Sequence, residues 1–172
     1  MAVIGIDPGT ALTGYGIVEE LADGSLKAIS YGVFKTDPKE SPELRLSSLF
    51  EQLNGLLLLH SLDCAAVEKL FFQRNVKTAL AVGQARGVIL LSLTLAKKPI
   101  FEYNPMDIKQ AIAGYGRAEK KQMQQMVKIL LDLDKIPEPD DAADALAVAI
   151  CHIHSRRLLQ TSNSNEDDHQ SL

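Results

Sequence analysis

Hydrophobic residues at the start of the chain follow patterns typical of short β-strands. Residues 2–7 (AVIGID) form an apolar run that ends in an aspartate, and two further strand-like stretches lie at 13–20 and 26–35. Turn sequences, PGT and ADGS, separate these stretches, so each strand is expected to pair with the next along the chain. The pattern therefore predicts an antiparallel meander of three strands, of which residues 2–7 form a central, buried one.

Helical periodicity begins after Ser41, which precedes a proline and a glutamate as expected at a helix N-terminus. An apolar stripe typical of a long helix follows, made of Leu46, Leu49, Leu53, Leu56 and Leu57. Further apolar stretches predict two short strands, at 64–68 and 99–103, and four more helices, at 77–96, 105–113, 119–131 and about 141–159. This order of elements predicts an α/β fold in which helices cover both faces of one sheet.

The length of the chain, 172 residues, suits a single compact domain, which we expect to span residues 1–159. Residues 160–172 are polar and non-periodic, so we expect a disordered tail there. The longest apolar runs, at 56–59 and 88–96, are much shorter than the roughly 20 residues of a membrane-spanning helix. The chain also opens without the basic start and apolar stretch of a signal peptide, so we expect a cytoplasmic protein without membrane contact.

Cysteines and histidines lack the spacing of a zinc site. Cys64 and Cys151 are far apart, and each lies in an apolar run, so both are interpreted as buried thiols. His152 and His154 are two residues apart, which places them on different sides of a helix. We interpret these histidines as structural or surface residues and not as ligands.

Charge is distributed unevenly along the chain. The net charge is −4, but residues 1–68 hold 4 basic and 10 acidic side chains, residues 69–128 hold 11 and 3, and residues 129–172 hold 3 and 9. A block of +8 therefore lies between two blocks of −6. This division suits a basic surface for phosphates beside an acidic site for cations. A solvated lysine-rich helix at 117–128 is the alternative, although basic residues are spread over the whole middle block.

Four carboxylates stand at positions where an unpaired charge would be costly. Asp7 ends the first strand, Glu68 ends the strand at 64–68, and Asp144 lies among alanines and leucine inside the last helix. Asp141 precedes Asp144 by three residues and so shares its helix face. A buried carboxylate needs a cation or hydrogen bonds, and a metal ion is the simplest partner.

Carboxylate oxygens without histidine or cysteine favour Mg²⁺ or Mn²⁺ over zinc. Four such groups balance the charge of two divalent ions, and a pair of ions about 3.5–4 Å apart is the usual clamp for in-line attack on a phosphodiester. One ion would activate water and the other would stabilise the leaving oxygen. The residues alone leave alternatives open, since Asp140 or Asp141 could cap the helix that follows Pro139 and strand-end acids are also common on surfaces.

Four segments of the chain carry a family resemblance. They are IGIDPGTALTGYGIV, AAVEKLFFQRN with TALAVGQARGV after it, YNPMDIKQAIAGYGRAEKKQM and DDAADALAVAICH, and they occur in this order across residues 2–152. Together they resemble the signature regions of the RuvC family of bacterial Holliday junction resolvases. The resemblance implies a ribonuclease H-like fold, a five-stranded mixed sheet flanked by helices.

The resemblance also implies an activity and a set of partners. Asp7, Glu68, Asp141 and Asp144 fall on the family's metal-binding catalytic acids, which implies two Mg²⁺ ions per site, with Mn²⁺ as a substitute. The expected reaction is the paired, symmetric incision of four-way DNA junctions in recombination and DNA repair. A homodimer is implied as well, acting with the branch-migration proteins RuvA and RuvB.

The segment after Glu68 combines aromatic rings and cations beside the expected metals. Phe71, Arg74 and Lys77 are therefore expected to contact DNA, by stacking on unpaired bases or by binding phosphates. Burial of both phenylalanines is the alternative. Phe71 matches the stacking position of the family, so Phe72 is assigned to packing.

Lys109 and Lys120 match family lysines near the scissile phosphate, and we expect them to contact DNA and to stabilise charge, with Lys120 taking part in catalysis. Without the resemblance, both would be interpreted as ordinary surface lysines. Gly83 and Gly87 lie four residues apart in a predicted helix and indicate close packing there. The family's dimer interface and packing of this helix onto the sheet remain open as explanations.

Two other classes of protein fit part of the sequence. GIDPGT also resembles the first phosphate-binding loop of the actin and sugar-kinase superfamily, but those proteins close two lobes over a nucleotide and 172 residues supply one. A non-catalytic junction-binding module would be expected to lack the acids, and all four are present. The nuclease interpretation is therefore preferred.

Overall fold

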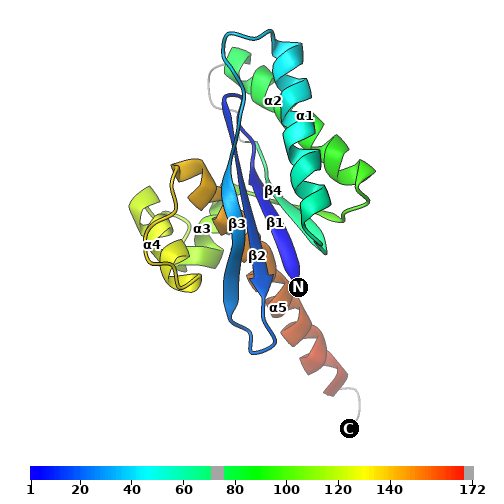
Figure 1. Ribbon diagram of the computed structural model, residues 1–172. Coiled ribbons are helices and arrows are strands. Elements are labelled where there is room, and N and C mark those ends of the chain that lie inside the picture. The colour runs from blue at the N-terminus through cyan, green and yellow to red at the C-terminus, as the bar shows by residue number, and fades with distance from the viewer. Residues whose placement is uncertain (71–75, 169–172) are drawn as a thin grey trace.

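The computed structural model describes residues 1–70 and 76–168 and contains one mixed α/β arrangement (Figure 1). Its elements in chain order are β1 (Ala2–Asp7), β2 (Leu12–Glu20), β3 (Leu26–Lys35), α1 (Pro42–Leu59), β4 (Cys64–Glu68), α2 (Val76–Leu95), β5 (Ile100–Tyr103), α3 (Pro105–Ala113), α4 (Lys120–Leu130) and α5 (Asp140–Asp168). The predicted strands and helices are confirmed to within about one or two residues at each boundary, apart from the end of α5.

The five strands form one sheet in the order β3-β2-β1-β4-β5. Strand β1 pairs antiparallel with β2 and β2 pairs antiparallel with β3, which confirms the predicted meander. The pairs β1–β4 and β4–β5 are parallel. Because β1 and β4 run in the same direction side by side, their carboxyl ends, at Asp7 and Glu68, meet at one edge of the sheet.

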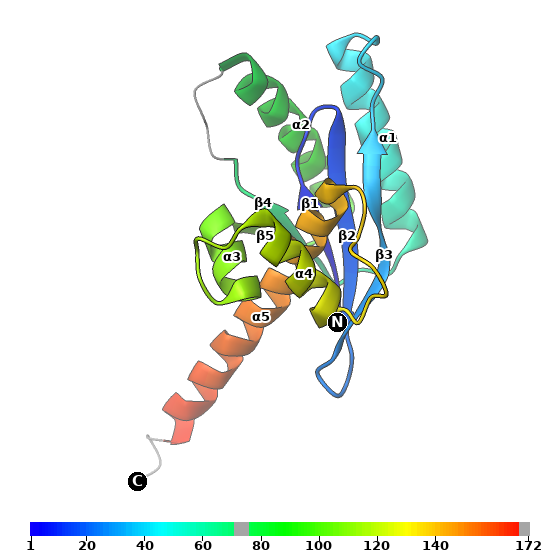
Figure 2. The same cartoon turned by 90° about the vertical axis from the view of Figure 1, so that its left-hand side faces the viewer.

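Helices cover both faces of the sheet (Figures 1 and 2). Helices α1 and α2 lie on one face, where Ile4 and Ile6 of β1 pack in a core with Leu53 and Ile89. Helices α3, α4 and α5 lie on the other face. Side chains alternate between the two sides of a strand, so a central strand covered on both faces must be apolar at successive positions. This explains the unbroken apolar run of β1.

Helix α5 packs against the sheet at backbone distance. A Cβ atom added to Gly5 of β1 would overlap the carbonyl oxygen of Ala145, and one added to Gly14 of β2 would overlap that of Asp141. Only glycine leaves room for a helix backbone to approach this closely. The two glycines therefore set the depth at which the first turns of α5 lie over β1 and β2.

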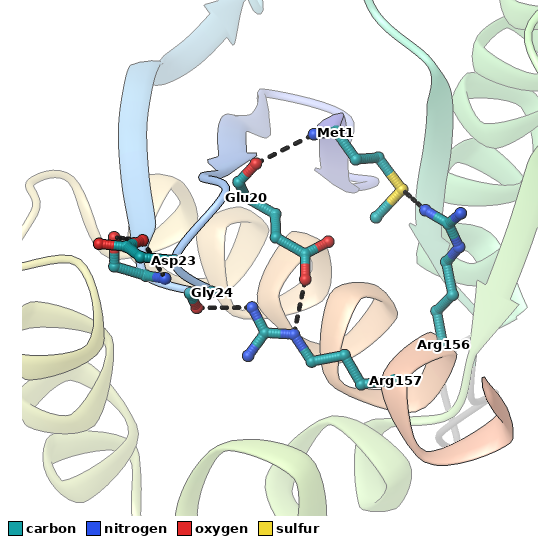
Figure 3. Close-up of polar contacts among 7 residues, drawn as sticks. Met1, Glu20, Asp23, Gly24, Arg156 and Arg157 are labelled. Atoms are coloured by element: carbon teal, nitrogen blue, oxygen red, sulfur yellow. Dashed lines mark hydrogen bonds and ion pairs between the residues drawn. The ribbon is translucent and has the colours of Figure 1, made fainter. Parts of the chain in front are cut away.

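The far half of α5 extends beyond the sheet (Figure 2) and ends at Asp168, whereas the sequence predicts an end at about Leu159. Arg157 fastens this part of the helix to the β2–β3 turn, since its Nε donates to Glu20 Oε1 at 2.7 Å and an Nη atom donates to the Gly24 carbonyl at 2.6 Å (Figure 3). The expected disordered tail at 160–172 falls partly outside the described residues and stays a prediction.

The cysteines and His152 belong to the core. Cys64 and Cys151 are buried and free, as predicted. His152 is also buried, with Nε2 3.3 Å from Cys64 Sγ and Nδ1 2.8 Å from the Tyr103 hydroxyl. The structural interpretation of His152 is therefore confirmed. In the part of the chain that the structure describes, no helix is both long and apolar enough to cross a membrane.

Candidate active site

Asp7 and Glu68 lie together at the edge of the sheet where β1 and β4 end. Burial, followed by the charges of Glu68 and Asp144, raises the pKa of Asp7 from 3.8 to about 8. Burial also raises the pKa of Glu68, although its hydrogen bond with Asp7 works in the opposite direction. The hydrogen bond between the two side chains favours Asp7 in its protonated form, as the donor, and Glu68 in its ionised form, as the acceptor.

Asp141 and Asp144 reach the same place from α5. The backbone of Asp141 lies directly over Gly14, and Gly14 pairs with Asp7 in the sheet. The charge of Asp141 acts on both Asp7 and Asp144. Asp144 lies between the fully buried Ala143 and Ala145, and burial raises its pKa despite a hydrogen bond from a lysine. The structure therefore brings together all four acids that the sequence singles out.

Within the described residues, the four carboxylates lie near one another but would have to rearrange to coordinate an ion together. Within residues 1–70 and 76–168, no group of three or more His, Cys, Asp or Glu side chains is placed to hold an ion as it stands. The proton that Asp7 retains at neutral pH, because its pKa is raised to about 8, and the ammonium of Lys120 at Asp144 balance part of the negative charge. An all-carboxylate set still fits Mg²⁺ or Mn²⁺ by its chemistry, because these hard cations prefer oxygen and would relieve the repulsion that raises the Asp7 pKa. The assignment of metal ligands stays a prediction.

Two lysines border the acids. A cavity of about 250 Å³ opens beside Glu68 and Asp144 and is lined by Lys109 of α3 and Lys120 of α4, together with apolar residues of α3, α4 and α5. Lys120 Nζ donates to Asp144 Oδ2 at 3.1 Å and lies 3.2 Å from Asp140 Oδ2. Burial would lower the pKa of Lys120, but its bonds to Asp144 and Asp140 outweigh this and raise it. Both lysines therefore present positive charge at the mouth of the acid cluster.

Local sequence sets the N-termini of the two helices that carry these lysines. Asn104 and Asp107 form a capping box at the N-terminus of α3, and Glu119 and Gln122 form another at the N-terminus of α4. Lys120 is the first residue of α4, directly after its cap, and Lys109 lies in the second turn of α3. The caps hold the two helix starts, and with them the lysines, beside the carboxyl ends of β1 and β4.

Asp140 makes contacts that its sequence neighbours do not predict. The sequence leaves helix capping open for this residue, whereas its carboxylate binds α4, accepting a hydrogen bond from Gln124 Nε2 at 2.7 Å and lying against Lys120. Gln124 and Asp140 are 16 residues apart in the chain. No local pattern links them, so this pair emerges only from the packing of α4 against α5.

The expected DNA contacts after Glu68 remain untested. Phe71 and Arg74 lie outside the described residues, and so does the side chain of Lys77 at the start of α2. Phe72, assigned to packing, also lies in that segment. Lys69 is exposed immediately after β4, and its backbone NH donates to the Tyr103 carbonyl at 2.8 Å.

Comparisons with known proteins agree with this architecture. A family model described as crossover junction endodeoxyribonuclease RuvC matches residues 3–152. RuvC of Syntrophomonas wolfei is 52% identical over 158 residues, which cover 92% of this chain and 91% of that protein. The structure of Thermus thermophilus RuvC superposes with a TM-score of 0.85 at 36% identity, covering 92% of this chain and 96% of the other.

A second Thermus thermophilus RuvC structure, solved in complex with a Holliday junction substrate, superposes with a TM-score of 0.84 at 33% identity and with the same coverage. The ribonuclease H-like fold inferred from the sequence is thereby confirmed. The match extends from β1 to the core of α5 and so includes every element that contributes an acid to the cluster. The chain belongs to the RuvC family of crossover junction endodeoxyribonucleases.

Proposed function

We propose that this protein resolves four-way DNA junctions by paired, symmetric, metal-dependent hydrolysis of phosphodiester bonds, in recombination and DNA repair. Family membership and the junction-bound Thermus thermophilus relative support the substrate. The observation that carries the reaction type is the convergence of Asp7, Glu68, Asp141 and Asp144. Burial, together with the charges of the other three acids, raises the pKa of Asp7 to about 8. Such a concentration of buried carboxylates is suited to binding divalent cations.

In this proposal, the four acids hold two Mg²⁺ ions, for which Mn²⁺ can substitute. When bound, these ions supply an activated water and stabilise the leaving oxygen. Asp7 gives up its proton on binding, since Asp7 and Glu68 are both needed as ionised ligands. Metal affinity should therefore rise with pH through the range in which Asp7 titrates.

Lysines are proposed to bind the DNA strand and to stabilise charge at the scissile phosphate. Lys120 lies at the acid cluster and would stabilise the negative charge that develops on the scissile phosphate, while Lys109 would bind the same strand across the cavity. Phe71, Arg74 and Lys77 would hold the DNA near the crossover, the ring by stacking and the cations at phosphates. These assignments rest on the family resemblance together with the basic middle block of the chain.

A homodimer is proposed because symmetric incision needs two sites. Helix α2 buries Ala85, Ile89 and Leu93 against its own domain and leaves the opposite side exposed. That exposed side carries Leu80, Gly83, Gly87, Leu91 and Leu95, and among the described residues only the backbone of α2 itself lies within 4 Å of a Cβ added to either glycine. An exposed apolar stripe interrupted by glycines suits close helix packing with a second copy.

RuvA and RuvB are the expected protein partners, and the cytoplasm is the expected compartment.

Incision of synthetic junctions tests the proposal. Four-way, three-way and linear duplex DNA would be compared on gels with and without Mg²⁺, using the natural chain and Asp7→Asn. We expect cutting of the four-way junction alone, only with metal, and a loss of at least about a hundredfold in Asp7→Asn with junction affinity retained. A normal cutting rate in the variant would show that the acids are misassigned. Metal-independent binding without incision would favour a junction-binding module, and micromolar binding of an ATP analogue would favour the kinase-like alternative.

A further inference from the structure

Lys120 lies between two carboxylates of different character. One is Asp144, a proposed metal ligand, whose Oδ2 is 3.1 Å from Lys120 Nζ. The other is Asp140, whose Oδ2 is 3.2 Å from the same nitrogen and which lies outside the proposed ligand set. An ammonium group at these distances can bond to both acids at once.

Asp140 is itself held in place by α4. Gln124 Nε2 donates to Asp140 Oδ1 at 2.7 Å, and Gln124 is a buried polar residue with 9% of its surface exposed. Hydrogen bonds from Lys120 and then from Gln124 lower the pKa of Asp140, so this carboxylate is ionised at neutral pH. The two oxygens of Asp140 therefore bond to separate partners on α4, one of them buried and the other, Lys120, half exposed.

Lys120 and a metal ion would compete for Asp144. A carboxylate that binds a divalent cation has little charge left for an ammonium group, and the two cations repel each other. The side chain of Asp140 is more exposed than that of Asp144, 61% against 34%, and is not among the proposed ligands. Asp140 can therefore keep its bond to Lys120 when Asp144 is engaged.

We infer that Asp140 is a positioning residue that anchors Lys120 at the edge of the acid cluster, leaving Asp144 available for metal. The inference rests on the proposed function and adds to it a role for an acid outside the ligand set. Without this anchor, Asp144 alone of the two acids would hold Lys120, and the ammonium group would oppose metal binding there. Gln124 supports the arrangement by fixing the orientation of the Asp140 carboxylate.

The kinetic test is a double-mutant cycle on junction cleavage with Asp140→Asn, Lys120→Ala and the double variant. Asp140→Asn is expected to lower kcat by about tenfold with little change in KM, and to add almost nothing when Lys120 is already alanine. Asp140→Glu should recover most of the loss, because it restores the charge. Asp134→Asn, which removes an exposed acid from the α4–α5 loop, is the matched control and should behave as the natural protein. Additive losses in the double variant would overturn the inference.

A second measurement does not depend on cleavage. Mg²⁺ binding would be followed by the rise in Tm with metal concentration, since a ligand stabilises the state that binds it. In Asp140→Asn, the Mg²⁺ concentration for half of the rise should increase about threefold, because Lys120 competes for Asp144. Removing Lys120 as well should abolish this increase. An unchanged midpoint in Asp140→Asn would contradict the inference.

The two proposals fail in different ways. If Lys120→Ala cleaves at the natural rate, Lys120 has no catalytic role, and that part of the proposed function is wrong. In that case the Mg²⁺ midpoints of the Tm curves still decide whether Asp140 restrains the lysine. If Lys120→Ala is impaired and Asp140→Asn is not, the proposed function stands and the positioning role of Asp140 is refuted. Gln124→Met, which removes the amide donor at similar size, should shift both readouts in the direction of Asp140→Asn but by less.

Discussion

The two faces of the sheet are covered by helices in different ways. On the α1 and α2 side, large aliphatic side chains such as Leu53 and Ile89 fill the space between helix and strand. On the α5 side, Gly5 and Gly14 let the helix backbone rest on the strands. The closer contact is on the side that carries Asp141 and Asp144. The difference indicates that contacts between backbone atoms, which allow little movement, set the position of α5. Helices α1 and α2 are instead held by side chains, which can repack.

Glycines on α2 provide the opposite case. Gly83 and Gly87 have open space around their Cα atoms, while Gly5 and Gly14 have none. The same residue type therefore serves two purposes in one chain, close packing inside the domain and an open strip on its surface. Substitution by alanine distinguishes these purposes, because the added methyl group either overlaps an atom or meets solvent.

Gly5→Ala is expected to have the largest effect on stability. Its methyl group would overlap the backbone of α5 at Ala145, so the helix must shift, at a cost of about 3 kcal/mol in the free energy of unfolding. Urea unfolding followed by circular dichroism measures this cost. A loss below about 0.5 kcal/mol would show that α5 can move away from the sheet without penalty, and the contrast between the two faces would no longer hold.

Leu91→Glu should break the proposed dimer and leave the domain folded. Leu91 is 53% exposed on α2, so the charge is tolerated in one copy but would be buried between two. We expect dimerisation to weaken by about 2 kcal/mol, or roughly thirtyfold in Kd, measured by sedimentation equilibrium. Leu44→Glu, at another exposed leucine on α1, is the control. Equal dimerisation of Leu91→Glu and the natural chain would exclude this strip as the interface.

The acid cluster should make the stability of the metal-free protein depend on pH. The pKa of Asp7 is raised from 3.8 to about 8 in the folded state, so between these values the folded protein keeps a proton that the unfolded chain has lost. The free energy of unfolding should therefore fall as pH rises from about 5 to 8, on the order of 1–2 kcal/mol, less than the full shift because Asp7 and Glu68 titrate together.

Urea titrations in the presence of a chelator measure this slope. Asp7→Asn should flatten it, since the amide cannot ionise, and saturating Mg²⁺ should flatten or reverse it by stabilising the ionised form. A slope that is as steep in Asp7→Asn as in the natural protein would mean that another group controls it.

Gly83→Ala should have the smallest effect and the opposite sign from Gly5→Ala. Outside the α2 backbone, the part of the chain that the structure describes places no atom within 4 Å of the added methyl group, and alanine favours the helix. The domain should therefore gain about 0.5–1 kcal/mol. The same variant should weaken a dimer that needs close helix contact at this position. A loss of stability in the monomer at low protein concentration would show that α2 is packed more tightly than its open surface indicates.

The order and type of the elements could be predicted from the sequence because they depend on local patterns. Apolar runs bounded by turn residues indicate β1 to β3, and Ser41 with Pro42 indicates the start of α1. The four acids could also be singled out, because an acid at a strand end or inside an apolar helix is unusual enough to need a partner. The end of α5 could not, since residues 160–168 are polar and a helix there lacks an apolar stripe.

The sequence alone determined that four carboxylates are exceptional in their surroundings and that basic residues gather between two acidic blocks. Three features depend on the packing of the folded chain: the hydrogen bond between Asp7 and Glu68, the depth at which α5 sits on Gly5 and Gly14, and the place of Lys120 between Asp140 and Asp144. These contacts join residues far apart in the chain through the packing of a helix on a sheet. Periodicity describes which face of an element is buried, whereas the distance between elements depends on every side chain, or missing side chain, that separates them.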